Sequence, residues 1–96
     1  MIVHIVMFKF HEENKSVNIA KVKEMLHALV EKIDGLLSME VGVDFNGSER
    51  AFDLVLYATF ETKEDLKSYA LHPEHLKALE LIKEVTLESK VVDYIK

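Results

Sequence analysis

Two segments of the chain read as β-strands that are apolar on both faces, and this feature restricts the possible folds more than any other. The segments are residues 2–10, IVHIVMFKF, and residues 51–60, AFDLVLYATF. A sheet with one solvent-exposed face alternates apolar and polar residues along each strand. Both faces of this sheet must therefore be covered by other layers of protein.

Between these two strands the spacing of apolar residues changes. From Ser16 to about Asp34 they recur every three or four positions, which predicts an amphipathic helix. Its core-facing stripe consists of Ile19, Val22, Leu26, Leu29, Val30 and Ile33. Gly35 is expected to end this helix, because glycine adopts a positive φ without a Cβ clash.

The middle of the chain predicts a β-hairpin. Residues 38–46 alternate with a period of two, and the turn-forming residues 46–50, NGSER, lead into the second of the two apolar strands. Thr62 and Asp65 then resemble a helix-capping pair. We therefore expect a short helix over residues 63–71.

The only proline of the chain, Pro73, interrupts the last helical region. Proline disfavours helical geometry in the residue before it and is well suited to the first position of a new helix. The chain is therefore expected to bend at His72 and to continue as a helix from Pro73 to about Glu84. A final strand is predicted over residues 90–96.

The element order β-α-β-β-α-β predicts one α+β domain over residues 1–96 with a ferredoxin-like fold. In this fold a four-stranded antiparallel sheet carries its helices on one face, here with the second helix broken at Pro73. The opposite face stays apolar and uncovered in a monomer, which is typical of an interface. We expect a homodimer through this sheet face, which forms a dimeric α+β barrel.

Composition excludes several classes of protein. The 96 residues contain no cysteine, which excludes disulfides and thiolate sites and agrees with a cytoplasmic location. A net charge of −5 argues against nucleic acid as a partner. There is no run of about eighteen apolar residues to span a membrane, and the first ten residues lack the basic region and cleavage site of a signal peptide. We expect an unprocessed cytoplasmic chain with no membrane partner.

Further segments carry a resemblance. They are HIVMFKF at residues 4–10, IDGL at the helix exit, FDLVL running into TFET, YALHPEH at residues 69–75 and VVDY near the end. Together they resemble the Dabb family, the stress-responsive dimeric α+β barrel domains, over essentially the whole chain. The Tyr-x-x-His-Pro-x-His run with the closing Val-Asp-Tyr is the most specific part. Asp34 stands where the family often has proline, which concerns the stiffness of a loop.

The resemblance implies a dimer, no cofactor and a candidate site. In the cyclase branch of the family, the tyrosine and the last histidine of the run act as an acid–base pair in an aldol closure. By motif position these are Tyr69 and His75, with His4 and His72 as pocket-lining companions. The helical period independently turns Tyr69 and His75 toward the sheet.

Two functions stay open on this basis. Histidine can take a proton next to a carbonyl, and a tyrosine hydroxyl can stabilise the resulting oxyanion. The chain would then be a cofactor-independent lyase, cyclase or oxygenase that acts on a small carbonyl or phenolic compound in an apolar pocket. In the alternative, it is a stress-associated structural or binding domain whose motif only fixes the helix bend. A deep pocket lined by His4, Tyr69 and His75 favours the enzyme, whereas a core filled at that point by leucine and phenylalanine side chains favours the structural alternative.

Metal and nucleotide sites have little support. His72 and His75 are three residues apart, but Pro73 interrupts the helix that would align them, and no third ligand is evident. The glycines form no phosphate-binding run. We therefore expect neither a metal nor a cofactor.

Overall fold

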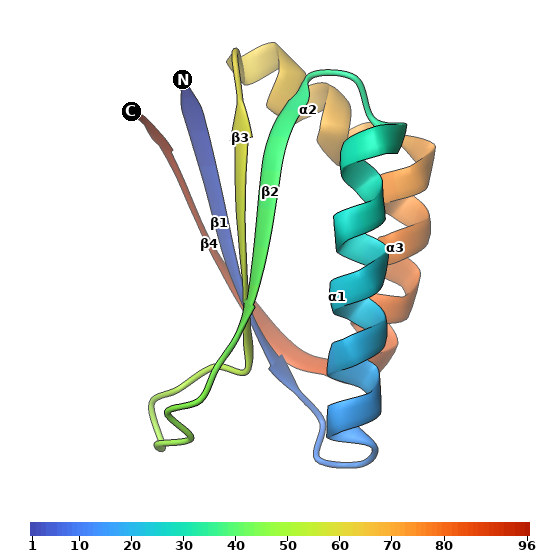
Figure 1. Cartoon of the computed structure of the whole chain (residues 1–96), viewed down its shortest axis with the longest axis vertical. Helices are drawn as coiled ribbons and strands as arrows, with labels where there is room; N and C mark the ends of the chain where they lie inside the picture. Colours follow the sequence, from blue (N-terminus) through green and yellow to red (C-terminus); the bar gives the residue numbers. More distant parts are fainter.

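The computed structural model describes residues 1–96 as one four-stranded sheet with three helices on one of its faces (Figure 1). The elements are β1 (Ile2–Phe10), α1 (Lys15–Lys32), β2 (Leu36–Val43), β3 (Leu54–Phe60), α2 (Lys63–Leu71), α3 (Pro73–Val85) and β4 (Thr86–Ile95). The predicted order is confirmed, including the division of the second helix at Pro73.

The strands are ordered β2-β3-β1-β4, and all neighbours are antiparallel. Residues that lie opposite each other in such a sheet project from the same face. In this register His4 of β1 lies between Ala58 of β3 and Asp93 of β4. The arrangement is the expected ferredoxin-like α+β fold.

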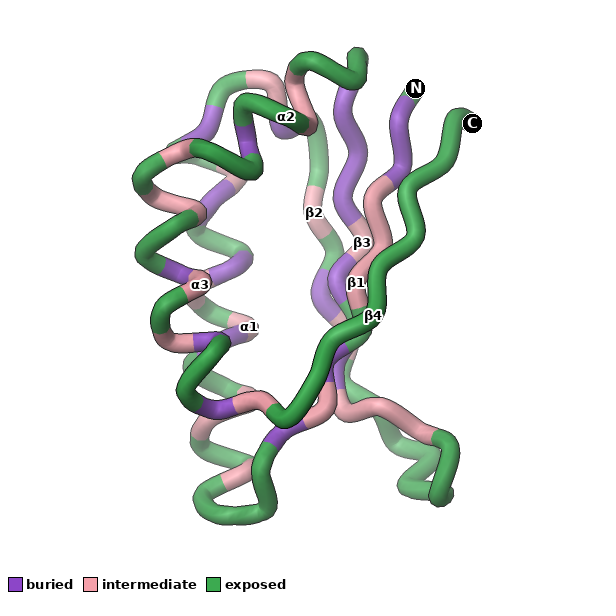
Figure 2. Tube along the Cα trace, turned by 180° about the vertical axis from the view of Figure 1, so that it is seen from behind, coloured by how far each residue is buried: buried purple, intermediate pink, exposed green.

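The core fills the space between the helices and the inner face of the sheet. The strands contribute Phe8, Leu54, Leu56, Ala58 and Phe60, and the helices contribute Val22, Leu26, Leu29, Tyr69, Ala78 and Ile82. No residue of β4 is buried, and this strand runs exposed along one edge of the sheet (Figure 2). The helix layer therefore covers the inner face but leaves it open along β4.

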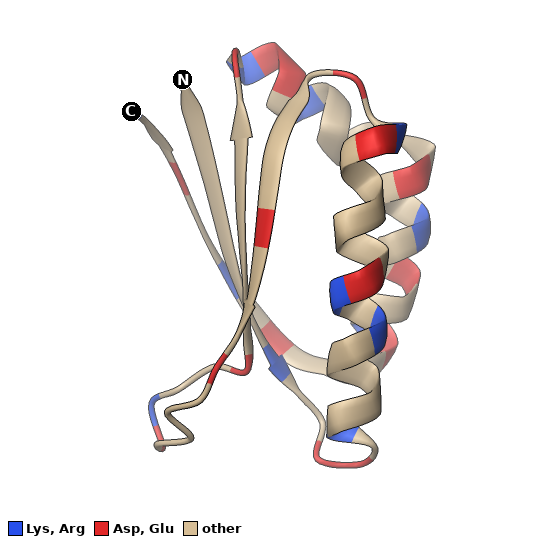
Figure 3. Ribbon diagram, viewed as in Figure 1, with Lys and Arg blue, Asp and Glu red and all other residues tan.

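The opposite face of the sheet carries no helix, and we call it the bare face (Figure 1). Following the register outward from Val55, its apolar and aromatic side chains are those of Val3, Ile5, Met7, Val55, Tyr57, Val92 and Tyr94. The same register also places Lys9, Ser38, Glu40, Thr59, Glu88 and Lys90 on this face. Val55 is 37 % exposed and Val92 is 60 % exposed. Charged residues gather on the helices and loops and are sparse on the strands (Figure 3). The bare face is therefore apolar along the middle of β1 and β3, as the sequence predicted, with charged residues toward its edges on β2 and β4.

The bounds of three strands differ from the prediction. β2 spans Leu36–Val43 instead of residues 38–46, β3 begins at Leu54 instead of residue 51, and β4 begins at Thr86 instead of residue 90. At β4 the chain turns directly out of α3, because the Thr86 hydroxyl donates to the Ile82 carbonyl oxygen at 2.7 Å. Pairing with β1 then extends the strand toward the helix.

The β2–β3 connection is longer than the predicted turn. Residues 44–53 extend away from the helices, on the side of the bare face (Figure 1). The Asp44 carboxylate accepts the backbone N–H of Gly47 at 2.8 Å, and Gly47 has a φ of +67°. The backbone N–H of Asp44 still donates to the Asp53 carbonyl oxygen at 2.9 Å, and the chain leaves the sheet beyond this bond.

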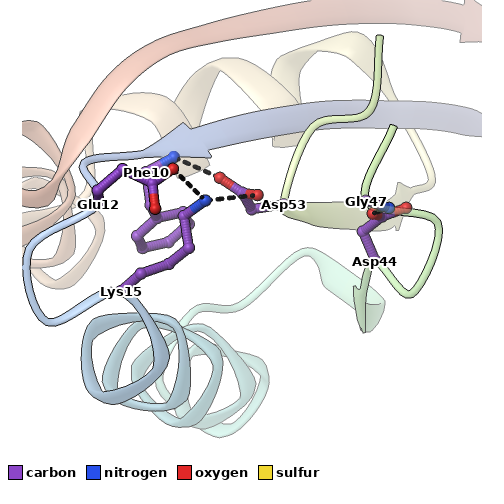
Figure 4. Close-up of polar contacts among 6 residues, drawn as sticks. All are labelled: Phe10, Glu12, Lys15, Asp44, Gly47 and Asp53. Carbon is purple, nitrogen blue, oxygen red and sulfur yellow. Dashed lines mark hydrogen bonds and ion pairs between the residues drawn. The ribbon is translucent and has the colours of Figure 1, made fainter. Parts of the chain in front are cut away.

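Asp53 anchors the end of this connection to the first strand and the first helix (Figure 4). Its carboxylate accepts the backbone N–H of Phe10 at 2.7 Å, where the pairing of β1 with β4 shifts register. The same carboxylate lies 3.4 Å from the ammonium group of Lys15, which also pairs with Glu12. Asp53 thus satisfies a backbone donor that the register shift leaves without a strand partner.

None of the helices combines the length and the hydropathy that a membrane crossing requires.

Candidate functional site

The bend between α2 and α3 is built by Thr62, His72 and Pro73. Thr62 caps α2 by accepting the backbone N–H of Asp65 at 3.1 Å, which confirms the predicted capping pair. His72 has the extended backbone that proline imposes on its predecessor, with φ −66° and ψ 136°. Its Nδ1 accepts the backbone N–H of Glu74 at 3.1 Å and so caps α3. The His72 ring is therefore engaged in holding the bend.

Tyr69 points from α2 into the core, as its helical position predicts. It is 1 % exposed, and its ring lies 5.2 Å from the Phe60 ring, measured between centroids. Its hydroxyl group is buried and has no hydrogen-bond partner. Burial raises the pKa of Tyr69 above its ordinary value, so the hydroxyl keeps its proton. A buried hydroxyl without a partner is rare in folded proteins and is a candidate for contact with a ligand.

His75 lies in the first turns of α3 and packs against Tyr69, with 4.3 Å between ring centroids. Its Nδ1 lies 3.1 Å from the carbonyl oxygen of Ala70. A carbonyl oxygen only accepts, so Nδ1 carries the proton and Nε2 of the neutral ring keeps its lone pair. Burial lowers the pKa of His75, the bond to Ala70 partly opposes this, and the nearby His4 and His72 lower it further. His75 is therefore neutral at pH 7, with a basic nitrogen available.

His4 is oriented in the same way by Asp93. The two residues face each other across β1 and β4, and the His4 Nδ1 is hydrogen-bonded to the Asp93 carboxylate. This bond leaves Nε2 of His4 as the second free imidazole nitrogen. The His4 ring lies 6.1 Å from the Tyr69 ring and 6.4 Å from the Phe60 ring.

The structure thus brings together three of the four predicted site residues. We call His4, Tyr69, His75 and Asp93 the histidine–tyrosine cluster. It offers two oriented imidazoles and one protonated phenol, which suits proton transfer rather than nucleophilic attack. No group of three or more histidine, aspartate or glutamate side chains is placed to hold a metal ion.

The expected pocket is not found at these residues themselves. None of the five principal hollows is lined by His4, Tyr69, His72 or His75. Phe60 and Tyr69 fill the space that the sequence left for a cavity. The hollow that reaches the cluster has a volume of about 250 Å³ and is lined by Ile2, Lys63, Leu66, Asp93, Tyr94 and Ile95. We call it the α2–β4 hollow.

Asp93 is the member of the cluster that sequence reasoning missed as a site residue. It stood out only as part of the closing Val-Asp-Tyr segment. Its relation to His4 depends on the register between the first and last strands, which lie 89 positions apart along the chain at this pair. Nothing local in the sequence fixes that register.

Comparison with known proteins identifies the family. The family model for the stress responsive A/B barrel domain, Dabb, matches residues 2–96. The chain is 34 % identical over 97 residues to a stress-response A/B barrel domain-containing protein of Arabidopsis thaliana, covering 99 % of this chain and 36 % of that protein. It is 27 % identical over 99 residues to a second such protein of the same plant, covering 96 % and 45 %. The chain therefore spans less than half the length of these curated relatives.

Solved structures agree with the sequence match. A dimeric protein of unknown function with a ferredoxin-like fold from Bacteroides fragilis is 35 % identical, with a TM-score of 0.91 and coverage of 99 % of this chain and 95 % of that one. The hydroxynitrile lyase of Passiflora edulis has a TM-score of 0.87 at 18 % identity, covering 99 % and 92 %, and so shares the fold. The match of the family model over nearly all residues, together with these relatives, shows that the chain belongs to the stress-responsive A/B barrel domain family, Dabb.

Proposed function

We propose that the histidine–tyrosine cluster catalyses proton transfer on a small carbonyl compound without a cofactor. The observation that carries this proposal is the pair Tyr69 and His75: a buried hydroxyl without a partner packs against an imidazole whose Nδ1 is anchored and whose Nε2 is free. His75 takes a proton from the carbon next to the carbonyl. The Tyr69 hydroxyl donates to the oxyanion that develops.

The protonation states agree with these roles. A general base must be unprotonated, and the lowered pKa of His75 keeps it so at neutral pH. A hydrogen-bond donor must keep its proton, and the raised pKa of Tyr69 ensures this. His4, held by Asp93, supplies a second imidazole on the side of the cluster that faces the α2–β4 hollow.

The reaction class proposed here is that of a lyase or cyclase, which needs only acid–base groups. The hydroxynitrile lyase named above shares the fold, and this lends the class some support. The chain contains no cysteine that could act as a nucleophile.

A second function is favoured by a different observation. Tyr69 is nearly fully buried against Phe60, and His72 caps α3, so the motif already has a structural role. On this basis the chain is a stress-associated structural or binding domain without catalysis. The two proposals predict different effects of removing the His75 imidazole: the catalytic proposal predicts loss of proton exchange, and the structural proposal predicts none.

The test is the exchange of carbon-bound protons for deuterium in small aryl ketones, with phenylacetone and benzylacetone as probes, followed by proton NMR in D₂O. We expect the wild-type protein to accelerate exchange over buffer. His75→Ala should lower the accelerated exchange rate by at least about 100-fold, which is typical of a lost general base. The wild-type rate should rise with pH through a pKa below 6.5 and then stay level, because only neutral His75 is active.

Two matched variants control this experiment. His27→Ala removes an exposed imidazole from α1, outside the cluster, and should leave exchange unchanged. Tyr57→Phe removes a hydroxyl from the bare face and serves as the control for Tyr69→Phe. Exchange at the buffer rate with the wild-type protein, or equal loss in His75→Ala and His27→Ala, contradicts the catalytic proposal and favours the structural one.

We also propose that the chain forms a homodimer through the bare face. The support is the apolar character of that face together with the dimeric state of the similar protein from Bacteroides fragilis. Two copies placed sheet to sheet would enclose the apolar strands between two helix layers.

A further inference from the structure

We propose that the β2–β3 connection is an arm that packs against the second copy of the dimer, with Phe45 as its main contact. We call residues 44–53 the arm. This inference rests on the proposed homodimer through the bare face. It adds the segment outside the sheet that holds the two copies together.

The arm presents a phenylalanine that its own chain does not cover. It projects from the sheet on the side of the bare face, away from the helices (Figure 1). Phe45 lies near its start and is 100 % exposed, whereas the other exposed large hydrophobic side chains reach at most 67 %. The Phe45 ring therefore buries essentially none of its surface within the monomer.

An apolar hollow joins the arm to the bare face. It has a volume of about 310 Å³, and its lining includes Phe45 and Phe52 of the arm together with Met7 and Val55 of the bare face. Single apolar residues are common on protein surfaces, but a continuous apolar patch is typical of an interface. Phe45 thus extends the apolar surface that the dimer is proposed to cover.

The arm is held in place at both of its ends. The backbone N–H of Asp44 donates to the Asp53 carbonyl oxygen at 2.9 Å, and the N–H of Asp53 donates to the Phe8 carbonyl oxygen at 2.8 Å. The ammonium group of Lys9 lies 5.7 Å from the centroid of the Phe52 ring. A segment that is ordered before association loses little conformational entropy when it binds.

The sheet alone is small for a stable interface. Its strands have seven to ten residues, and at ~3.3 Å per residue and ~4.8 Å between strands the four cover roughly 500 Å² in projection. Specific interfaces bury about 800 Å² on each partner. The edges of the bare face on β2 and β4 are also charged. Contacts beyond the sheet are therefore expected, and the arm is the segment that projects on this side.

A second copy of the chain is the partner that fits this surface. The arm and the bare face are continuous through the hollow, so a partner that covers the bare face meets the arm as well. In a two-fold dimer the same patch of both copies takes part, and each arm contacts the other copy. The similar protein from Bacteroides fragilis, 35 % identical, is dimeric.

The first test measures the dissociation constant of the dimer by sedimentation velocity over a dilution series. A two-fold interface contains each contact twice, so we expect Phe45→Ala to raise this constant at least about 100-fold. Phe45→Trp should retain most of the affinity, because the aromatic ring is kept. Circular dichroism should be unchanged in both variants, since Phe45 is fully exposed in the monomer.

Leu71→Ala is the matched control. Leu71 is 67 % exposed, but it lies at the end of α2, in the helix layer. Its removal should leave the dissociation constant unchanged. Equal effects of Phe45→Ala and Leu71→Ala overturn the proposal.

The second test locates the arm directly. The chain has no cysteine, so Ser48→Cys places a single nitroxide spin label on the arm. Labelled chains are mixed with ¹⁵N-labelled wild-type chains, and the broadening of the ¹⁵N-chain amide signals is measured. We expect stronger broadening of signals from β1 and β3 than from α1, which lies beyond the sheet (Figure 1). The same label at Leu71→Cys should leave the strand signals sharp. Broadening that is strongest in α1, or absent, contradicts the arm contact.

The outcomes separate the arm from the dimer itself. A wild-type protein that is monomeric at micromolar concentration overturns both. A wild-type dimer that Val55→Asp dissociates and Phe45→Ala does not weaken keeps the bare-face interface and overturns the arm, which leaves Phe45 to a partner other than this chain.

Discussion

At the scale of single residues, the site depends on how two imidazoles are oriented. His75 donates from Nδ1 to a backbone carbonyl and His4 is held at Nδ1 by a carboxylate, so both present Nε2. The helical period predicted that Tyr69 and His75 face the sheet, because the direction of a helical side chain depends only on its position within its own helix. Asp93 could not be assigned from sequence, because its role follows from strand register.

Tyr69→Phe should stabilise the protein slightly. The hydroxyl is buried without a partner, so its removal ends a desolvation cost without losing a hydrogen bond. We expect the free energy of unfolding to rise by about 1 kcal/mol, measured by denaturant titration. A clear loss of stability in Tyr69→Phe would show that the hydroxyl has a structural partner.

At the scale of secondary structure elements, the bend between α2 and α3 was predictable because proline acts on its immediate neighbours. The predicted strand ends were wrong where side chains bind the backbone across the fold. Asp53 holds the N–H of Phe10, 43 positions away. Such contacts override strand propensity, and they are visible only when the strands are placed in space.

His72→Ala should destabilise the protein by about 1 kcal/mol, because it removes the side-chain cap of α3. His72→Asn should retain most of the stability, since asparagine is a good helix cap. Thermal melts of the two variants test this. Equal losses in both would mean that the ring contributes by packing and that the bond to Glu74 has no effect on stability.

At the scale of the whole molecule, the sequence predicted the layers and the apolar bare face, but not which strand residues form that face. The alternation of residues along each strand defined two sets of side chains, one for each face of the sheet, and both sets were apolar. The structure assigns Leu54 and Leu56 to the core and Val55 to the bare face. The difference is set by where the helices lie, which depends on all three layers at once.

Val55→Asp should convert the proposed dimer into a folded monomer of 11.0 kDa. A charge buried without a partner in an interface is strongly unfavourable, whereas in the monomer it meets solvent. Light scattering measures the mass, and circular dichroism reports the fold. Val17→Asp, on the exposed side of α1, should stay dimeric, and Leu54→Asp should unfold the chain. A wild-type protein that is monomeric at micromolar concentration contradicts the dimer.

The pairing of β1 with β4 also predicts an order of folding. Nine residue pairs join the two strands that lie farthest apart in sequence, and the backbone N–H of Lys96 donates to the carbonyl oxygen of Met1 at 2.8 Å. Closing so long a loop is slow, so we expect this half of the sheet to form after the β2–β3 hairpin. In a circular permutant joined at these ends and opened at Gly47, we expect the reverse order. There β4 and β1 form a local hairpin, whereas the pairing of β2 with β3 closes the longest loop and forms last.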